Sequence, residues 1–344
     1  MNARALIAGF IGFLSFALIA AQEPPAPAPD YPDPPDFLAE RIADGRFELG
    51  YFEYLRGYFP EATEAEKAQY AALAQWMEAC EAEGQARLDD ELTELGIAPI
   101  ENSLLRALSV CQQLVMGDQF KDFASYAELA EATRGARLVF DTLVQSVKRA
   151  EERMPSSSPD DLNAEIERRT MADQMLRNAF GWGFSDVVAP RTPKMTAKER
   201  TVFVALLNSE VMRVDRQNTK WLKARVMKSG WPRISEVGKR AAFGAWLLTQ
   251  HADLDLAFQR RALRLMEPLV AEGEISRINY ASLYDRNARA LNIKQLYGLQ
   301  LVCENGAWVP HPIEDPDRVD ERRAAMGLGT LAEHIARESG PCGG

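Results

Sequence analysis

Apolar residues recur at helical spacing along most of the chain. Tyr70, Leu73, Met77 and Cys80 succeed one another at intervals of three or four residues, which places them on one face of an α-helix. The segments that we expect to be helices are 47–58, 64–83 with a continuation to 95, 103–116, 123–153, 162–179, 196–228, 235–250, one that Asp253 or Asp255 caps, and 276–291, followed by two short ones after 315 and 330. The pattern therefore predicts a mainly α-helical protein.

Capping residues mark the ends of the longest of these helices. Thr196, with Glu199 three residues later, forms a capping box that starts a helix. Gly230 is expected to end that helix, because Pro232 two residues later cannot continue it. Ser235 is then expected to cap the next helix.

The C-terminal part departs from the helical pattern. The apolar runs 299–303 and 307–309 flank Asn305-Gly306, which is a strong signal for a two-residue hairpin turn. The sequence thus predicts a helical N-terminal unit and a helical C-terminal domain that carries one small β-hairpin near 299–309.

An apolar leader opens the chain. Residues 1–21 have the features of a signal peptide: Arg4 is basic, residues 5–21 carry no charge, and small residues precede a cleavage position at Gln22. We therefore expect a periplasmic or secreted protein. The alternative is a protein anchored to the inner membrane by residues 5–21, a run near the lower limit for spanning a bilayer.

Two proline-rich stretches set the expected domain boundaries. Residues 22–36 predict an extended linker, because proline lacks a donor and has a fixed φ. Residues 155–159, with a proline at each end of three serines, predict a second linker. The expected domains are a helical unit over 37–154 and a C-terminal domain over 160–338. The first of these shows no pattern typical of chemistry, so we expect a scaffold or a surface for a protein partner.

Charge excludes one class of partner. The chain has 40 Lys and Arg against 50 Asp and Glu, a net charge of −10, whereas nucleic-acid-binding proteins carry a basic surface. We expect no nucleic-acid partner, and membrane contact only through an uncleaved leader. The acidic residues are scattered, which indicates a solvated surface rather than an acidic tail.

The four cysteines favour disulfides in an exported chain. Sequence proximity prefers Cys80–Cys111 and Cys303–Cys342 among the three possible pairings. Buried free thiols are the alternative. The chain has no Cys-x-x-Cys pair and no histidine cluster, so the sequence indicates no zinc site.

His251 is the candidate catalytic residue. It lies at the expected end of a helix, and Asp255 would share its face if the helix ran one more turn. An imidazole oriented by a carboxylate is the arrangement that acid–base catalysis uses. The alternative is that His251 caps free carbonyls while Asp253 or Asp255 caps the next helix.

Several short motifs occur together in one order. They are Asp173-Gln174-x-x-Arg177, Asp215-x-x-Asn218, Gly230-Trp231-Pro232, Gln250-His251-Ala252-Asp253, Phe258-Gln259, Asp285-Arg286, Gln295-x-Tyr297-Gly298-x-Gln300, Pro312-Ile313-Glu314-Asp315, Arg322-Arg323 and Gly327-Leu328. With these motifs, residues 162–335 resemble a bacterial family catalogued as domain of unknown function 6624. Leu299 stands where the family pattern has threonine. The family has no established activity, so the resemblance implies a fold and pocket residues but no reaction.

The motif residues supply the candidate ligand-binding set, which is Asp173, Gln174, Arg177, Trp231, Asp285, Arg286, Gln295, Tyr297 and Gln300. We expect His251, Arg286, Gln295 and Tyr297 to line one cleft, with Asp173 or Asp255 orienting the basic groups. Arginine and amides suit a carboxylate or a polar, saccharide-like ligand. The sequence indicates no metal and no particular cofactor.

Three functions remain open at this point. The first is binding of a small polar or anionic ligand in a cleft of the C-terminal domain. The second is a hydrolase-type enzyme that uses His251 as acid or base. The third is a structural or interaction protein in which these polar groups are buried against one another.

Overall fold

Helices dominate the structure. The computed structural model describes residues 31–100, 110–155, 161–184, 193–337 and 342. Within these ranges the strands form two small antiparallel sheets of two strands each. The expected mainly α-helical fold with a small hairpin is confirmed.

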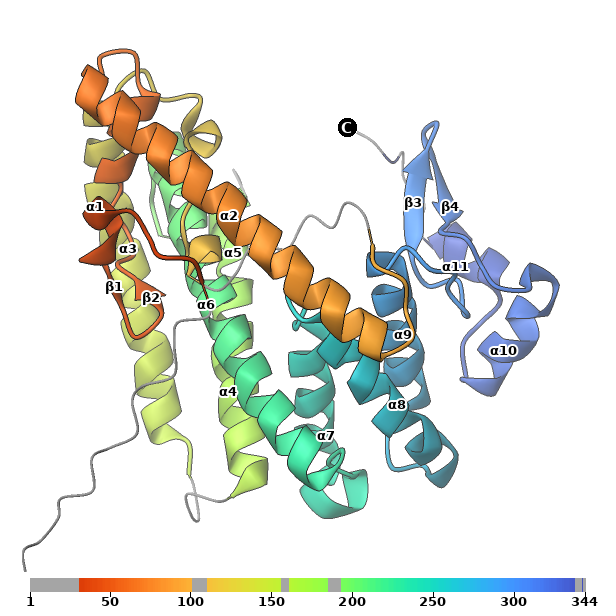
Figure 1. Cartoon of the computed structure of the whole chain (residues 1–344). Coiled ribbons are helices and arrows are strands. Elements are labelled where there is room, and N and C mark those ends of the chain that lie inside the picture. The colour runs from red at the N-terminus through yellow and green to blue at the C-terminus, as the bar shows by residue number, and fades with distance from the viewer. Residues whose placement is uncertain (1–30, 101–109, 156–160, 185–192, 338–341, 343–344) are drawn as a thin grey trace, which may run out of the picture.

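The N-terminal part is built on two long helices (Figure 1). Its elements are α1 Asp36–Ala39, β1 Ile42–Ala43, β2 Arg46–Phe47, the 3-10 helix η1 Glu53–Tyr58, α2 Glu64–Glu94, the 3-10 helices η2 Cys111–Gln113 and η3 Gly117–Phe120, and α3 Tyr126–Arg153. Helix α2 runs diagonally from this part of the molecule to the C-terminal helices.

The predicted helix over 47–58 is wrong in its first half. Asp44 and Gly45 adopt left-handed backbone angles, with φ of 52° and 69°, and turn β1 into β2. Asp-Gly is a hairpin turn signal that outweighs the helical spacing of the aromatic residues after it. Only Glu53–Tyr58 is helical, and it is a 3-10 helix.

The predicted helix over 103–116 is corrected in the same way. Residues 101–109 lie outside the described part, and residues 110–116 contain only η2, with extended backbone at Leu114. Contacts to distant residues replace helical hydrogen bonds here. Gln113 accepts from the N–H of Phe47 at 3.1 Å and donates to the carbonyl of Gly45 at 3.1 Å.

The C-terminal part contains the remaining elements. They are α4 Leu162–Asn178, α5 Phe180–Phe184, α6 Ala197–Ser229, α7 Ile234–Gln250, α8 Leu256–Glu272, α9 Arg277–Ala290, β3 Leu301–Glu304, β4 Ala307–Pro310, the 3-10 helix η4 Pro316–Arg318, α10 Val319–Ala325 and α11 Leu331–Arg337. The hairpin predicted at Asn305-Gly306 is confirmed.

The expected caps of α6 are confirmed, and that of α7 is not. Thr196 and Glu199 form a capping box, and Gly230 ends the helix with a φ of 81°. Helix α7 starts after Arg233 rather than at Ser235, because the N–H of Ser235 is bound by the Glu274 carboxylate at 2.9 Å.

Helix α6 belongs to two hydrophobic cores. Its first half, including Phe203 and Leu206, packs in a core with Leu73 of α2 and Phe140 of α3. Its second half, including Leu222, packs in another core with residues of α7, α8 and α9. Residues 156–159 of the predicted linker 155–159 lie outside the described residues, so the domain boundary there stays a prediction.

Helix α2 also contacts the C-terminal helices through its far end. Leu92 is buried in a small cluster with Leu256 and Leu291. Glu91 forms ion pairs with Lys223 at 3.2 Å and with Arg261 at 2.9 Å. The N-terminal helices therefore brace the C-terminal ones.

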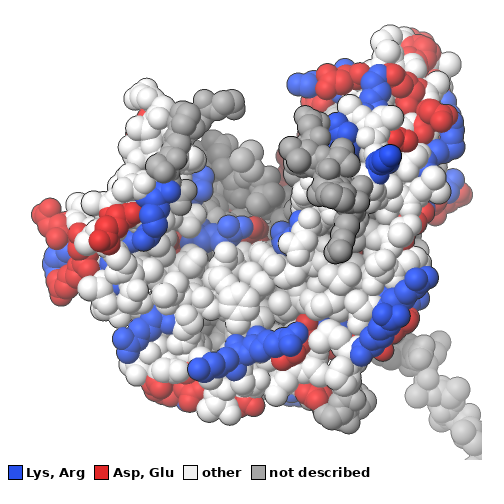
Figure 2. All heavy atoms as spheres, turned by 180° about the vertical axis from the view of Figure 1, so that it is seen from behind, with Lys and Arg blue, Asp and Glu red and all other residues white. Residues whose placement is uncertain are grey.

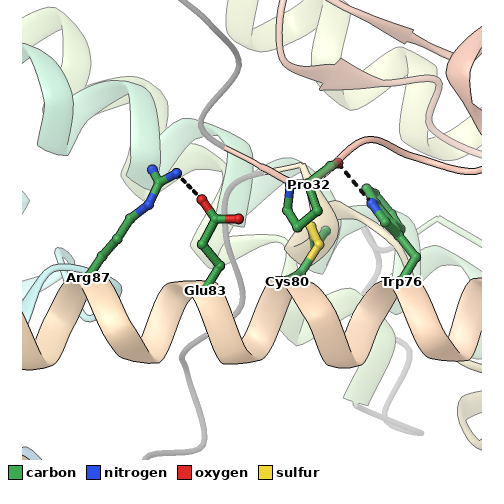
Figure 3. The surroundings of a disulfide bond; sticks show 6 residues. Pro32, Trp76, Cys80, Glu83 and Arg87 are labelled. Atoms are coloured by element: carbon green, nitrogen blue, oxygen red, sulfur yellow. Dashed lines mark hydrogen bonds and ion pairs between the residues drawn. A yellow bond between two sulfur atoms is a disulfide. The ribbon is translucent and has the colours of Figure 1, made fainter.

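Both predicted disulfides are confirmed. Cys80 on α2 is bonded to Cys111, with 6.4 Å between their Cα atoms, and Cys303 on β3 is bonded to Cys342, at 5.5 Å. Figure 3 shows the first one, beside Trp76, whose indole donates to the carbonyl of Pro32 at 3.0 Å. The two bonds fit a protein that folds in an oxidising compartment.

Removing the Cys80–Cys111 bond should destabilise the protein more than removing Cys303–Cys342. Cys80 and Cys111 are fully buried in the first core, while Cys303 is exposed. We expect C80A/C111A to lower the free energy of unfolding by about 2–4 kcal/mol in urea titrations. C303A/C342A is the matched control. Equal losses would contradict the assignment of the first bond to the core.

The leader lies outside the described residues, as does most of the predicted linker 22–36. Among the helices that the structure describes, none combines the length and the apolar character needed to cross a bilayer.

Candidate functional site

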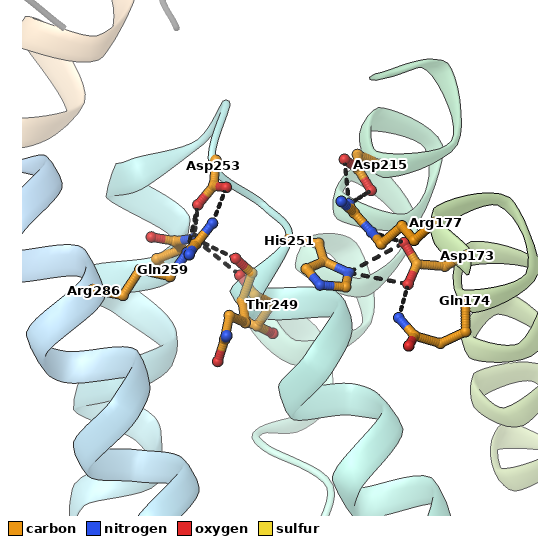
Figure 4. Close-up of polar contacts among 10 residues, drawn as sticks. Asp173, Gln174, Arg177, Asp215, Thr249, His251, Asp253, Gln259 and Arg286 are labelled. Carbon is orange, nitrogen blue, oxygen red and sulfur yellow. Dashed lines mark hydrogen bonds and ion pairs between the residues drawn. The ribbon is translucent and has the colours of Figure 1, made fainter. Parts of the chain in front are cut away.

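Three helices bring an imidazole and two carboxylates together (Figure 4). Asp173 comes from α4, Asp215 from α6, and His251 from the end of α7. The Nδ1 of His251 lies 3.1 Å and 3.0 Å from the two carboxylate oxygens of Asp173. Asp173 is 1% exposed, and the His251 side chain is 14% exposed. The pair is therefore buried on the carboxylate side and partly open on the imidazole side.

Arg177 joins the two carboxylates. Its Nε donates to Asp173 at 2.9 Å, and its Nη2 donates to the two oxygens of Asp215 at 2.6 Å and 2.7 Å. Gln174 donates to the other oxygen of Asp173 at 2.8 Å. Three of the predicted ligand-binding residues, Asp173, Gln174 and Arg177, thus bind one another.

The two carboxylates titrate in different ranges. Burial raises the pKa of Asp215 to about 7, although the charge of Arg177 acts in the opposite direction. Burial acts in the same sense on Asp173, but the hydrogen bond and charge of His251 and the charge of Arg177 outweigh it and lower the pKa of Asp173. One carboxylate is therefore ionised at neutral pH, while the other exchanges a proton near it.

Asp255 does not take the role expected of it. Helix α7 ends at Gln250, so the four-residue relation to His251 is lost. Asp255 instead caps α8 by accepting from the N–H of Phe258 at 2.8 Å, and it binds Lys223 at 2.7 Å. Asp173, 78 positions away in the sequence, orients the imidazole.

Arg286 is held in a second polar cluster. Its Nε donates to Asp253 at 3.0 Å, and a second nitrogen contacts the other oxygen of Asp253. Gln259 links the same aspartate to the end of α7, with a bond of 3.1 Å to the carbonyl of Thr249 (Figure 4). The charge of Asp253 also acts on Asp215, so the two clusters are neighbours.

Asp285 and Gln295 form a third network, which holds the loop before β3. The fully buried Asp285 carboxylate accepts from the N–H groups of Leu296, Tyr297 and Leu299 at 2.8–3.2 Å. Burial raises the pKa of Asp285 against the lowering effect of these N–H groups.

Gln295 uses all of its side-chain polar atoms within this loop. Its amide donates to the carbonyls of Gln300 at 3.0 Å and His311 at 2.6 Å, and its oxygen accepts from the N–H of Gln300 at 2.9 Å. It has no exposed surface. Gln295 is therefore not placed on an open cleft with His251 and Arg286.

The two predicted aromatic residues lie on different cavities. Trp231 lines one of about 360 Å³ together with Phe243 and Trp246. Tyr297 lines another of about 570 Å³ together with Arg260. The nine candidate residues are thus distributed over three polar networks and two cavities.

The first cluster has the ligand types of a cation site. One ligand atom each from Asp173, Asp215 and His251 lies within 4.8 Å of the others. Arg177 already bonds to both carboxylates and supplies a positive charge between them. A metal ion would have to displace that guanidinium, so the geometry favours proton chemistry over metal binding.

Comparison with known protein families gives a match in the C-terminal part of the chain. Residues 194–340 match DUF6624, a family of unknown function. The resemblance stated for the sequence is confirmed over this segment. The segment contains α6 to α11, Asp215 and His251, whereas Asp173, Gln174 and Arg177 on α4 precede it. Neither the curated proteins nor the solved structures gave a match to the chain.

Sequence reasoning missed Asp215 and Arg260 as site candidates. Asp215 belongs to a quoted motif, and its spacing of three from Asn218 was a usable signal. Arg260 lies four residues before Arg264 on α8, and Tyr280 lies four before Tyr284 on α9, so each pair shares a helix face. Only the packing of α8 against α9 brings the two faces together.

Proposed function

We propose that the protein is exported and that the domain built around its DUF6624 segment performs acid–base chemistry on a small polar or anionic molecule at His251. The pairing of His251 Nδ1 with the buried Asp173 carboxylate carries this proposal. A carboxylate accepts a hydrogen bond only from a protonated nitrogen, so Nδ1 carries the proton. In the neutral form of the ring, Nε2 then offers its lone pair to a substrate.

The surroundings of the ring support this reading. Among the described residues, Nε2 has no hydrogen-bond partner. Asp215, whose pKa burial raises to about 7, lies beside Arg177 and can hold or release a proton near neutral pH. Groups with separated pKa values in one cluster are typical of acid–base sites.

Export rests on the sequence of residues 1–21 and on the two disulfides. A signal peptide delivers the chain to a compartment in which Cys80–Cys111 and Cys303–Cys342 persist.

Substitution of His251 tests the proposal. The probes are p-nitrophenyl acetate, p-nitrophenyl phosphate and p-nitrophenyl glycosides. We expect the full chain to turn over one of these classes, and H251Q to lower kcat by about 10²–10⁴-fold, because a positioned acid or base contributes that much. D173N should also lower kcat, since it removes the charge that orients the ring.

The controls separate chemistry from stability. H311Q changes another half-buried histidine outside the cluster and should leave kcat unchanged. H251Q should keep the melting temperature close to that of the parent. Turnover that is absent with every probe or equal in H251Q, or unfolding of H251Q, would overturn the proposal in favour of a structural cluster.

A further inference from the structure

A cavity of about 570 Å³ lies between α8, α9 and the end of α10. This volume is in the range of small-molecule sites. Its lining includes Arg260, Arg264, Arg277, Tyr280, Tyr284 and Tyr297. All of the lining residues fall within the DUF6624 segment.

Arg260 presents unpaired donors in this region. Its Nε and Nη1 are buried and have no hydrogen-bond partner in the part of the chain that the structure describes. The guanidinium lies over the ring of Tyr284, with 5.1 Å from its Cζ to the ring centroid. The side chain as a whole is only partly buried, and no carboxylate among the described residues pairs with it, so its charge remains available to an anion in the cavity.

The rest of the lining is also positive. Arg264 and Arg277 line the same cavity, and Glu267 is the one acidic side chain among its lining residues. Arg264 uses Nη2 to donate to the carbonyl of Leu95 at 2.7 Å, which leaves further donors on the same group. Three guanidinium groups against one carboxylate favour an anion.

Three tyrosines form an aromatic wall beside these arginines. The ring centroids of Tyr280 and Tyr284 are 6.2 Å apart, and those of Tyr284 and Tyr297 are 6.1 Å apart with planes at 83°. Burial raises the pKa of Tyr297 to about 12, so its hydroxyl stays protonated at neutral pH. The wall can pack against a ring.

Hydrogen bonds to the loop before β3 fix one side of the wall. Asp285 binds the N–H of Tyr297, and the buried Arg323 donates to the carbonyl of Tyr297 at 2.6 Å. Arg322 donates to the carbonyl of Leu296, which also lines the cavity, at 2.8 Å. Both the N–H and the carbonyl of Tyr297 are therefore hydrogen-bonded, which fixes the backbone on that side of the cavity.

We propose that this cavity binds a small molecule that carries a carboxylate or phosphate group on a ring. The oxyanion lies against the guanidinium of Arg260, and the ring packs against the tyrosines. Binding here does not depend on chemistry at His251, which does not line the cavity.

Calorimetric titration of the full chain measures how much the oxyanion and the ring each contribute to binding. The probes are phenyl phosphate, benzoate, inorganic phosphate and benzyl alcohol. We expect phenyl phosphate and benzoate to bind, and phenyl phosphate to bind about tenfold more tightly than inorganic phosphate, because ring contacts are added. The neutral benzyl alcohol should not bind. Equal affinity for benzyl alcohol, or no binding of any anion, would overturn the proposal.

Arg260→Met separates a ligand site from a structural role. Losing charge-assisted hydrogen bonds should weaken phenyl phosphate binding by about 10–100-fold. The free variant should be as stable as the parent or more stable, because two buried donors without acceptors are removed. Arg289→Gln, an exposed change on α9 outside the lining, is the control for charge and should retain binding. Unfolding of the Arg260→Met variant, or unchanged binding in it, would contradict the site.

Discussion

Replacing Asp285 by alanine should lower the free energy of unfolding by about 3–5 kcal/mol, because three loop N–H groups lose one charged acceptor. The carboxylate is fully buried and accepts from Leu296, Tyr297 and Leu299. Asp285→Asn keeps one acceptor oxygen and should therefore lose less stability than Asp285→Ala. Urea titrations of the purified variants measure both effects.

An exposed aspartate gives the matched control for Asp285. Asp317→Ala, on η4, should change the free energy of unfolding by no more than about 0.5 kcal/mol. If Asp285→Ala were as stable as this control, Asp285 would be free for a ligand rather than committed to the loop. The same variant should lose anion binding in the neighbouring cavity, since Tyr297 is no longer held there.

A second large loss of stability is expected for a change at Arg177, and its size depends on pH. Arg177→Met leaves the buried Asp173 and Asp215 without the cation between them. We expect the free energy of unfolding to fall by about 3–5 kcal/mol at pH 8, the loss typical of removing one partner of a buried ion pair. The loss should be smaller at pH 5.

The smaller loss of stability expected at pH 5 follows from the pKa of Asp215. Burial raises it from 3.8 to about 7, so the folded state keeps a proton that the unfolded state releases. The stability that this contributes is complete below the unfolded pKa and is lost as the pH rises through about 7. Without Arg177, which lowers this pKa, the penalty for ionising Asp215 grows.

Asp173 affects the pH dependence of the stability in the opposite direction. Its pKa is lowered in the folded state, so its contribution is present at high pH and is lost on acidification. Part of the loss in Arg177→Met at pH 8 therefore comes from Asp173. A double variant, Arg177→Met with Asp215→Asn, removes the ionising group and should recover stability at pH 8. Equal losses at pH 5 and pH 8 in the single variant would contradict the role of Asp215.

Local signals in the sequence predicted much of the fold. The capping box at Thr196, the helix stop at Gly230 and the hairpin at Asn305-Gly306 each depend on residues a few positions apart. The signal that decides the structure before residue 53 is also local, because the Asp44-Gly45 turn forms a hairpin where the aromatic repeat alone predicted a helix over 47–58.

The site was less predictable because its contacts are not local. His251 was recognised as a candidate, but its partner Asp173 lies 78 positions away and Asp255 was the nearest alternative in sequence. The roles of Asp285 and Gln295 depend on burial, which turns ligand-like side chains into acceptors and donors for their own loop. Arg260 carried no local signal of being unpaired, since only packing determines which acceptors it reaches.

The length of α6 constrains how this chain can change. The helix has 33 residues, and its two halves present different faces to two different cores. One inserted or deleted residue between Val211 and Leu222 would rotate one half against the other by about 100°. Asp215 lies in this interval, so a change next to it would also disturb its ion pair with Arg177. Among homologues, insertions and deletions should therefore occur in the loops and be absent from the middle of this helix.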